Sequence, residues 1–425
     1  MDAYSTLAGT PHFHTRADEL WCEGVRVADL AAAHGTPLYV YSRAAMADRY
    51  ARVRAAFGPD AHVCYAVKAN SNLGVLRTFA ALGAGFDLVS RGELRRLQVA
   101  GLDPRRAVFA GVAKDADDIA EALAAGILFF NVESPHELPL LAAAGRARGV
   151  RVPLALRLNP DVDAGTHAYI STGKSENKFG VSLATAAEVV AQIRRTPELD
   201  LVGYHVHLGS QLKSARPYLD ALTRVEAFLD AAPAHREGLR YHDLGGGFGV
   251  GYGDPTSVLD VEALAAAVLP RLRARGLTPV IEPGRFLVAD AGVLVSTVLG
   301  RKAGVDRDFL LVDAAMNDLI RPALYEAEHP IAPLRHPRAE TTGRPCDVVG
   351  PVCETSDFLG LSRALPALAP GDLLAVFGAG AYGASMASNY NSRRRPAEVM
   401  VTGEQVDLLR RRERFEDLWA AELES

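Results

Sequence analysis

The feature that most constrains the fold is an alternation of short β-rich runs with longer Ala- and Leu-rich runs between residues 63 and 284. The β-rich runs cover residues 63–69, 86–89, 107–111, 128–132, 153–159, 201–209, 241–247 and 279–284. Several of the intervening runs end in glycine, which commonly caps the C-terminus of a helix. Eight strands that alternate with helices predict a (β/α)8 barrel, and an open doubly wound sheet is the alternative.

The pattern changes after Gly284, where Pro, Gly and Arg separate further β-rich runs and few helices are expected. These runs cover residues 293–299, 309–313, 346–350, 373–378 and 398–402, and they predict a mostly β domain. The first 37 residues lack the barrel periodicity. We therefore assign residues 38–288 to the barrel, and residues 1–37 with 289–425 to the β-rich domain. A long connection, residues 160–182, follows the fifth strand, and loops of this length are often functional.

Charge and composition exclude several classes of protein. The chain has 46 Lys and Arg against 51 Asp and Glu, a formal charge of −5, whereas a nucleic-acid-binding surface is basic. The N-terminus lacks the basic and apolar segments of a secretory signal, and no apolar run approaches the ~18 residues of a membrane span. The four cysteines form no Cys-x-x-Cys pair, which argues against structural zinc and for a reducing compartment. We expect a cytoplasmic protein that binds a small-molecule substrate and has no nucleic-acid, membrane or metal partner.

Polar and charged residues gather near the ends of the predicted strands, and the active sites of (β/α)8 barrels lie at the C-terminal ends. These residues are Lys68, Asp87, Arg157, His205, His207, Ser210, Gly245, Gly246, Gly247, Glu282 and Arg285. Lys68 stands in an apolar run, and because an unpaired buried ammonium is unfavourable, we expect it to be ion-paired or functional. His205 and His207 share one face of their strand, so both reach the barrel interior unless the strand ends between them.

Three parts of this set suit pyridoxal phosphate. A lysine amine can form a Schiff base with the aldehyde of that cofactor. The glycine run, Ser210 and Arg285 can supply hydrogen-bond donors to its phosphate. The carboxylate of Glu282 can keep the pyridine nitrogen protonated, which makes the ring an electron sink for chemistry at the Cα atom of an amino acid.

The residues leave two other interpretations open. In a metal-dependent barrel hydrolase, His205, His207, His242 and Asp243 would be the ligands and Lys68 would be carbamylated, but the glycine run and residues 282–285 would then have no role. Residues 378–383 match Gly-x-Gly-x-x-Gly, yet a dinucleotide site needs a helix after the motif. The residues that follow it show no helical periodicity and reach Pro396.

Nine motifs, in their order and spacing, carry a resemblance to a known family over nearly the whole chain. They are YAVKAN, GAGFDLVSRGE, NPDVDAGTHAYISTGKSENKFG, HVHLGSQ, GGGFGVGY, EPGR, MNDLIRPALY, VVGPVCETSDFLG and GAYGASMASNYNSRRRPAEVMV. Through them the sequence resembles the fold-type III, alanine-racemase-like enzymes that use pyridoxal 5′-phosphate, and within these the meso-diaminopimelate decarboxylases. The resemblance implies decarboxylation of meso-2,6-diaminopimelate to L-lysine and CO2, the last step of lysine biosynthesis, by a homodimer.

The resemblance also implies roles for individual residues. Lys68 forms the Schiff base, His207 stacks on the cofactor ring, and Glu282 contacts the pyridine nitrogen. Asp87 and Arg157 support the ring. The other implied cofactor contacts are Ser210, Gly245, Gly246, Gly247, Pro283, Gly284, Arg285 and Tyr382. Cys353 is the implied proton donor, and the implied substrate contacts are Arg285, Arg321, Tyr325, Glu354 and Tyr382. The segment with Cys353 and Glu354 is expected to come from the partner subunit.

The chemistry of the expected substrate fits two of these residues. Diaminopimelate has a distal carboxylate, which Arg321 can bind through its bidentate fork, and a distal ammonium, which Glu354 can accept. A decarboxylase of ornithine or lysine has no distal carboxylate and would leave Arg321 unsatisfied. The closest alternatives are sister decarboxylases that act on another basic or carrier-bound amino acid. A non-enzymatic cofactor carrier is a further alternative, but such carriers resemble the barrel alone.

Overall fold

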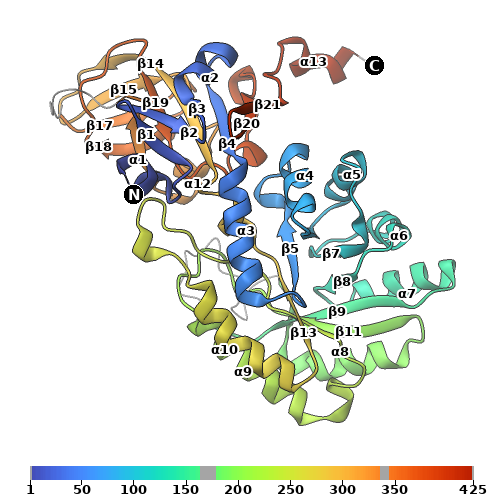
Figure 1. The fold of residues 1–425 in the computed structure, drawn as a ribbon. Coiled ribbons are helices and arrows are strands. Elements are labelled where there is room, and N and C mark those ends of the chain that lie inside the picture. The colour runs from blue at the N-terminus through green and yellow to red at the C-terminus, as the bar shows by residue number, and fades with distance from the viewer. Residues whose placement is uncertain (1, 163–178, 336–343, 424–425) are drawn as a thin grey trace. The chain divides into compact units, whose positions relative to one another are not determined.

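The computed structural model of the protein describes residues 2–162, 179–335 and 344–423. The chain forms two compact units (Figure 1). The barrel unit comprises Arg49–Val250 and Val258–Phe286. The β unit comprises Met1–Asp48, Gly251–Ser257 and Leu287–Ser425. The sequence-based domain limits at residues 38 and 288 stay a prediction beside these contact-defined units.

The barrel unit contains a closed ring of eight parallel strands, which confirms the predicted (β/α)8 barrel and excludes the open sheet. The strands are β5 (His62–Ala66), β6 (Gly85–Leu88), β7 (Ala107–Phe109), β8 (Phe129–Val132), β9 (Val152–Asn159), β11 (Leu199–His205), β12 (Tyr241–Asp243) and β13 (Thr278–Ile281). Each strand pairs with the next, and β13 pairs with β5, with Val280 opposite His62 and Ile281 opposite Val63. A short strand, β10 (Val181–Ser182), adds to the ring beside β9.

Helices follow the barrel strands. They are α4 (Leu73–Ala81), α5 (Arg91–Val99), α6 (Ala116–Ala125), α7 (Glu137–Arg148), α8 (Leu183–Arg195), α9 (Arg216–Ala231), α10 (Val261–Ala274) and the short α11 (Arg285–Val288), and α3 (Arg43–Phe57) precedes β5. The sequence sets both ends of α6. Asp115 and Asp118 form a reciprocal capping box at its N-terminus, and Gly126 ends it in the left-handed conformation at φ 73°.

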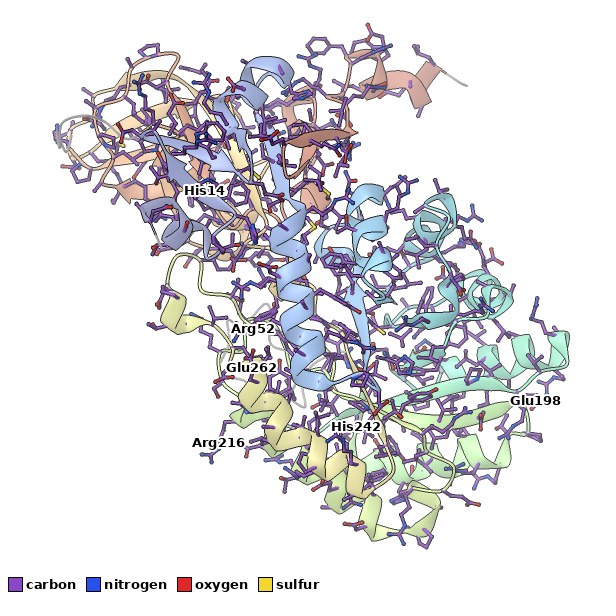
Figure 2. All side chains as sticks on the ribbon, in the orientation of Figure 1. His14, Arg52, Glu198, Arg216, His242 and Glu262 are labelled. Atoms are coloured by element: carbon purple, nitrogen blue, oxygen red, sulfur yellow. The ribbon has the colours of Figure 1, made fainter. Side chains whose placement is uncertain are left out.

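The interior of the barrel is apolar and tightly filled. One cluster contains fully buried side chains from six strands: Cys64, Val108, Phe129, Ala155, Val202 and Val280. On the outer surface, Arg52 of α3 forms a bidentate pair with Glu262 of α10, with both N–O distances 2.7 Å (Figure 2). Because both partners are substantially exposed, this pair contributes at most about 1 kcal/mol, and burial of the apolar cluster is the larger stabilising factor.

The β unit joins the N-terminal segment to the C-terminal part of the chain, as expected. One sheet has the order β18 (Phe358–Arg363), β17 (Cys346–Val349), β15 (Asp308–Val312), β14 (Gly292–Lys302), β4 (Leu38–Ser42), β20 (Ala397–Thr402), β21 (Gln405–Arg410). Two further strands, β19 (Leu373–Val376) and β16 (Ile331–Pro333), extend it from β14. The strands β1 (Phe13–Arg16), β2 (Glu19–Cys22) and β3 (Val25–Arg26) form a separate small sheet.

Short helices complete the description of both units. In the β unit they are α1 (Ala3–Ala8), α2 (Val27–His34), α12 (Arg321–Tyr325), α13 (Glu416–Leu423), η5 (Pro255–Ser257), η6 (Ala384–Met386) and η7 (Tyr390–Ser392). In the barrel unit they are η1 (Val67–Ala69), η2 (Pro104–Arg106) and η4 (Pro233–His235). No helix in the described ranges combines the length and apolar character needed to cross a membrane.

Two further sequence features are the Gly-x-Gly-x-x-Gly match and the long connection after β9. The Gly-x-Gly-x-x-Gly match follows β19, which is antiparallel to its neighbours and precedes only the 3-10 turn η6, so a dinucleotide-binding βαβ unit is excluded. Most of the long connection after β9, residues 163–178, lies outside the described residues.

The barrel cluster gives a stability prediction. Phe129→Ala removes its largest side chain and leaves a cavity, so we expect the free energy of unfolding, measured by urea denaturation, to fall by about 3–5 kcal/mol. Val99→Ala, at an exposed position on α5, is the control and should change it by less than about 0.5 kcal/mol. Similar losses in both variants would show that the cluster does not dominate barrel stability.

Candidate active site

Lys68 lies on the turn that ends β5, where η1 carries it past the last strand pairing. Its ammonium forms an ion pair with Asp87, which belongs to β6 and is fully buried. Burial and the nearby Glu282 raise the pKa of Asp87 to about 6, although Lys68 acts in the opposite direction. The structure therefore places a lysine and a buried carboxylate side by side at the C-terminal ends of adjacent strands.

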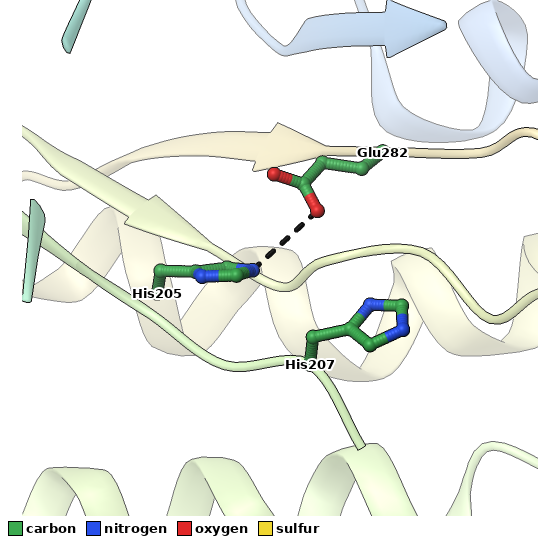
Figure 3. Close-up of side chains that lie close together, drawn as sticks. All are labelled: His205, His207 and Glu282. Atoms are coloured by element: carbon green, nitrogen blue, oxygen red, sulfur yellow. Dashed lines mark ion pairs between the residues drawn. The ribbon is translucent and has the colours of Figure 1, made fainter. Parts of the chain in front are cut away.

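Glu282 follows β13 and is the centre of the buried polar residues (Figure 3). Its Oε2 lies 3.4 Å from Nε2 of His205, and its Oε1 accepts a hydrogen bond from Nδ2 of Asn131 at 3.1 Å. Burial raises the pKa of Glu282, but the opposite effects of His205 and then Lys68 are larger together. The net pKa therefore lies well below the ordinary value. Glu282 is therefore an ionised carboxylate among cationic and donor groups.

His207 lies two residues past the end of β11, which finishes at His205. Its Nδ1 accepts a hydrogen bond from the backbone N–H of Gly246 at 3.1 Å, so a neutral ring carries its proton on Nε2. Burial and then Arg157 lower the pKa of His207 well below its ordinary value, which keeps the ring neutral. A neutral, oriented imidazole is thus held near Glu282, and the buried His205 lies to its left in the view of Figure 3.

The glycine run after β12 needs glycine at each of its three positions. A Cβ atom on Gly246 would lie 2.2 Å from the carbonyl oxygen of Glu282, and one on Gly247 would lie 2.2 Å from that of Gly209. Gly245 has φ +68° and would press against Val206 and His207. Beyond this run, the Arg285 guanidinium donates a hydrogen bond to Ser210 Oγ at 3.0 Å. Backbone packed this closely leaves amide groups and an Arg–Ser pair at one rim, a suitable donor set for a phosphate.

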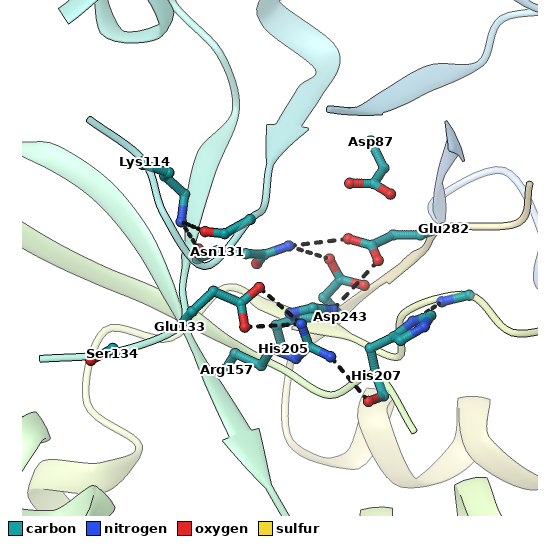
Figure 4. Close-up of polar contacts among 12 residues, drawn as sticks. Asp87, Lys114, Asn131, Glu133, Ser134, Arg157, His205, His207, Asp243 and Glu282 are labelled. Atoms are coloured by element: carbon teal, nitrogen blue, oxygen red, sulfur yellow. Dashed lines mark hydrogen bonds and ion pairs between the residues drawn. The ribbon is translucent and has the colours of Figure 1, made fainter. Parts of the chain in front are cut away.

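Arg157 of β9 is fixed by a carboxylate from the neighbouring strand end. Its Nη1 donates to both oxygens of Glu133, at 2.8 and 2.9 Å, and its Nη2 donates to the carbonyl of His207 at 3.3 Å (Figure 4). Its guanidinium also lies over the ring of Phe179, 4.8 Å from the centroid. Arg157 thus supports the backbone that carries His207.

A deeper ion pair holds the β8–α7 connection below the site. Lys114 Nζ pairs with Glu137 Oε2 at 2.5 Å and donates to the carbonyls of Gly111 and Asn131, both at 2.7 Å. The other Glu137 oxygen accepts the backbone N–H of Glu133 at 2.8 Å. These contacts position the segment from which Asn131 and Glu133 reach the site.

The β unit carries the other predicted residues, and Arg321 is the most constrained of them. Its Nη1 contacts His329 Nε2 at 2.7 Å, while His329 Nδ1 contacts the carbonyl of Phe377 at 2.8 Å. Because a guanidinium only donates and a carbonyl only accepts, His329 is neutral with its proton on Nδ1. The Arg321 guanidinium also lies 4.6 Å from the ring centroid of Tyr252. Arg321 is buried and oriented from two sides.

Cys353 and Glu354 lie on an exposed turn after β17. The side chain of Asp357 closes this turn by accepting the backbone N–H groups of Val352 and Met316, each at 2.7 Å. The backbone N–H of Cys353 donates to Asn391 Oδ1 at 2.7 Å, and Tyr390 donates to Glu354 at 3.3 Å. The turn therefore presents a thiol and a carboxylate on a fixed backbone. Tyr325 and Tyr382, the latter at φ +56°, are half-buried in the same unit.

The barrel unit brings together one group of predicted residues at one rim: Lys68, Asp87, Arg157, His207, Ser210, Gly245–Gly247 and Glu282–Arg285. The group Arg321, Tyr325, Cys353, Glu354 and Tyr382 belongs to the β unit. Asn131 and Glu133 were missed in the sequence. Both lie at the C-terminal end of the fourth barrel strand, so reading that strand end, which has Asn-Val-Glu, would have found them.

The structure gathers three groups that a metal ion could use, but they suit a metal poorly. Ligand atoms of His205, His207 and Glu282 lie within 4.8 Å of one another. However, Nδ1 of His207 already accepts the Gly246 amide, and His205 Nε2 faces Glu282 Oε2 at 3.4 Å. A phosphorylated pyridine fits the same residues better. The glycine run allows a close approach of backbone amides, and the buried Asp87 Oδ1 has no hydrogen-bond partner among the described residues.

A closed (β/α)8 barrel with a lysine, a buried carboxylate and a glycine cradle at one rim defines the class of barrel enzymes that bind pyridoxal phosphate. A family model described as "Pyridoxal-dependent decarboxylase, pyridoxal binding domain" matches residues 43–289. The chain belongs to this family of pyridoxal-dependent decarboxylases, whose cofactor is pyridoxal phosphate.

Curated and solved relatives agree with the family assignment. A diaminopimelate decarboxylase of Pseudomonas aeruginosa is 51% identical over 96% of this chain and 98% of its own. A crystal structure of diaminopimelate decarboxylase from Helicobacter pylori complexed with L-lysine is 41% identical, covers 94% of this chain and 100% of its own, and has a TM-score of 0.89. The corresponding M. jannaschii enzyme in co-complex with L-lysine is 34% identical, with coverages of 97% and 98% and a TM-score of 0.91.

The glycine run gives a prediction about cofactor affinity. In Gly246→Ala the new Cβ must displace backbone at Glu282, and strain of about 1–3 kcal/mol corresponds to a roughly ten- to hundredfold weaker affinity for pyridoxal phosphate. Absorbance titration of the apoprotein measures it. Gly300→Ala is the matched control, because a Cβ there meets no atom within 4 Å and its φ is ordinary. Equal affinities in the two variants would contradict a cradle at Gly246.

Proposed function

We propose that this protein decarboxylates meso-2,6-diaminopimelate to L-lysine and CO2, using pyridoxal phosphate. The observation that carries the proposal is the convergence of Lys68 and Glu282 at one rim of a barrel belonging to the pyridoxal-dependent decarboxylases. The identity of 51% to a curated diaminopimelate decarboxylase supports the choice of substrate.

The barrel residues would hold the cofactor at four places. The amine of Lys68 would hold its aldehyde end, and the ionised Glu282 would face the pyridine nitrogen. The Gly247 amide, with Ser210 and Arg285, would hold the phosphate, because the amides of Gly245 and Gly246 already bind Asp243 and His207. The neutral ring of His207 would cover one face of the pyridine. When bound, the cofactor supplies an electron sink for the charge that CO2 release leaves at the substrate Cα.

The β unit would select the substrate. Arg321 is preorganised by His329 and Tyr252, so its fork is available to the distal carboxylate without a large loss of side-chain entropy. Glu354, on the fixed turn after β17, would accept the distal ammonium. Arg285, Tyr325 and Tyr382 are the further substrate contacts that we propose. Amino acids without a distal carboxylate, the substrates of sister decarboxylases, would lack the charge that Arg321 recognises.

Cys353 would supply the proton that replaces CO2. Its thiol is exposed, and its backbone N–H is bound to Asn391, so the turn orients the side chain while leaving Sγ accessible. Transfer of the thiol proton to Cα converts this carbon to a CH2 group, and the resulting thiolate recovers a proton from solvent. Lys68 is the second candidate for this proton. We further propose that the protein acts as a cytoplasmic homodimer in which one subunit's Cys353 and Glu354 serve the barrel of its partner.

The function is tested by supplying the holoenzyme with a panel of meso-diaminopimelate, L-ornithine and L-lysine and measuring the CO2 and amine products. We expect CO2 and L-lysine from the meso isomer, and little turnover of the others because they lack the distal carboxylate. In Lys68→Ala we expect loss of the absorbance band of the lysine-bound cofactor together with activity. Preferred turnover of ornithine or lysine would refute the assigned substrate, and stoichiometric bound zinc without pyridoxal would refute the chemistry.

The proton donor is tested separately by single-turnover kinetics. Cys353→Ala should lower kcat about 10²–10⁴-fold, the usual contribution of a positioned general acid, while the cofactor absorbance stays unchanged. The control is Cys346→Ala, which removes a buried thiol of β17 that donates to the backbone carbonyl of Arg363. Near-normal turnover in Cys353→Ala would show that Cys353 is not the proton donor and would favour Lys68.

A further inference from the structure

Asn131 joins two buried carboxylates through a single amide group. Its Nδ2 lies 3.1 Å from Glu282 Oε1 and 3.5 Å from Asp243 Oδ2 (Figure 4). All three side chains are at most 5% exposed. The Asn131 backbone is held in turn, because its carbonyl accepts from Lys114 Nζ. The Asn131 amide is therefore buried and held in one orientation, and it contacts both carboxylates at once.

Two carboxylates in this position cannot both be ionised without a large cost in free energy. Glu282 has His205 Nε2 at 3.4 Å, and His205 and then Lys68 lower its pKa. Asp243 has a neutral donor, the backbone N–H of Gly245 at 2.8 Å from Oδ1. Burial and the charge of Glu282 raise the pKa of Asp243 well above its ordinary value. The proton shared by this pair therefore resides on Asp243.

We propose that Asn131 and a protonated Asp243 are positioning residues that keep Glu282 ionised and oriented toward the cofactor's ring nitrogen. The amide of Asn131 donates to Glu282, and Asp243 stays neutral, so no second charge competes for the cations of the site. The proposal rests on the proposed function only in taking Glu282 as the partner of the cofactor nitrogen. Neither residue is placed in contact with substrate.

Other titratable groups surround the pair. From the elements packed against it, these are Cys64 of β5, Lys68 of η1, Asp87 of β6, Arg157 of β9, His205 and His207 at the end of β11, and His242 of β12. Burial and His205 lower the pKa of His242 to about 4, so it stays neutral near pH 7. Asp87, with a pKa of about 6, also titrates in the acid range. A test must therefore compare variants rather than interpret one profile.

The two residues respond differently to substitution. Asp243→Asn replaces a neutral acid with a neutral amide of the same shape, so Gly245 keeps an acceptor and Glu282 keeps a donor. Asn131→Leu has a similar volume but removes the donor, so the ionised form of Glu282 loses stabilisation and its pKa rises. Because the ionised form is the partner of the protonated pyridine, the affinity for pyridoxal phosphate falls.

The experiment is an absorbance titration of each apoprotein with pyridoxal phosphate at pH 7, with far-UV circular dichroism to confirm folding. For Asp243→Asn we expect an affinity within about threefold of the original. Asn131→Leu should bind about tenfold or more weakly, as expected for loss of a hydrogen bond to a charged group. Asp347→Asn, a buried aspartate in β17, is the control for loss of a buried carboxylate.

Two measurements remain decisive if Asn131→Leu does not fold. The infrared spectrum at pH 7 should show a carbonyl band of a protonated carboxylic acid that disappears in Asp243→Asn. In the background of Glu282→Gln, removal of Asn131 by Asn131→Ala should cause no further loss of affinity, because its effect passes through Glu282. A tenfold loss of affinity in Asp243→Asn, or an additive effect of Asn131→Ala, would overturn the proposal. These readouts need no decarboxylation, so failure of the proposed substrate leaves them intact.

Discussion

The pairing of β13 with β5 is the contact on which the site depends. It closes the ring and places the segment after the last strand beside the segment after the first. The backbone N–H of Ala66 then donates to the carbonyl of Pro283 at 3.3 Å, and Gly284 packs so closely on Ala66 and Ala69 that a Cβ atom would meet theirs at about 3 Å. Lys68 and Glu282, more than 200 residues apart in the sequence, are neighbours because of this closure.

The closed rim brings several ionisable side chains together in a buried region of the barrel. Asp87, Asp243 and Glu282 are all buried, and each is paired with a donor or cation: Lys68, the Gly245 amide, and His205 with Asn131. Adjacent buried carboxylates repel each other when both are ionised, so such a set is stable only when some of them are protonated and others are ionised. The resulting pKa differences separate an ionised Glu282 from a protonated Asp243. Protonation of Asp243 thus lowers the free-energy cost of burying the carboxylates, and it leaves Glu282 ionised to face a cationic ring.

Much of the fold was predictable because barrel strands are buried on both faces and appear as short apolar runs bounded by Gly or Pro. Residues 38–42 show the limit of this rule. They form a fully buried Leu-Tyr-Val-Tyr-Ser strand of the kind a barrel uses, yet β4 pairs with β14 and β20 in the β unit. Only long-range pairing decides which sheet such a strand joins. Asn131 and Glu133 stand at the end of the fourth strand in the sequence, but their partners Glu282 and Arg157 come from other strands, so only the tertiary structure shows their roles.

The sequence by itself determined the barrel class, the family and the identity of the chemical groups, since strand periodicity and motif spacing are local properties of the chain. The tertiary structure decided which groups act together. Whether His205 or His207 is exposed to a ligand depended on β11 ending at His205, which leaves the first buried and the second on the rim. Which carboxylate is ionised depended on distances between strands. Coulomb energies and desolvation follow spatial separation and burial, and neither can be read from positions along a chain.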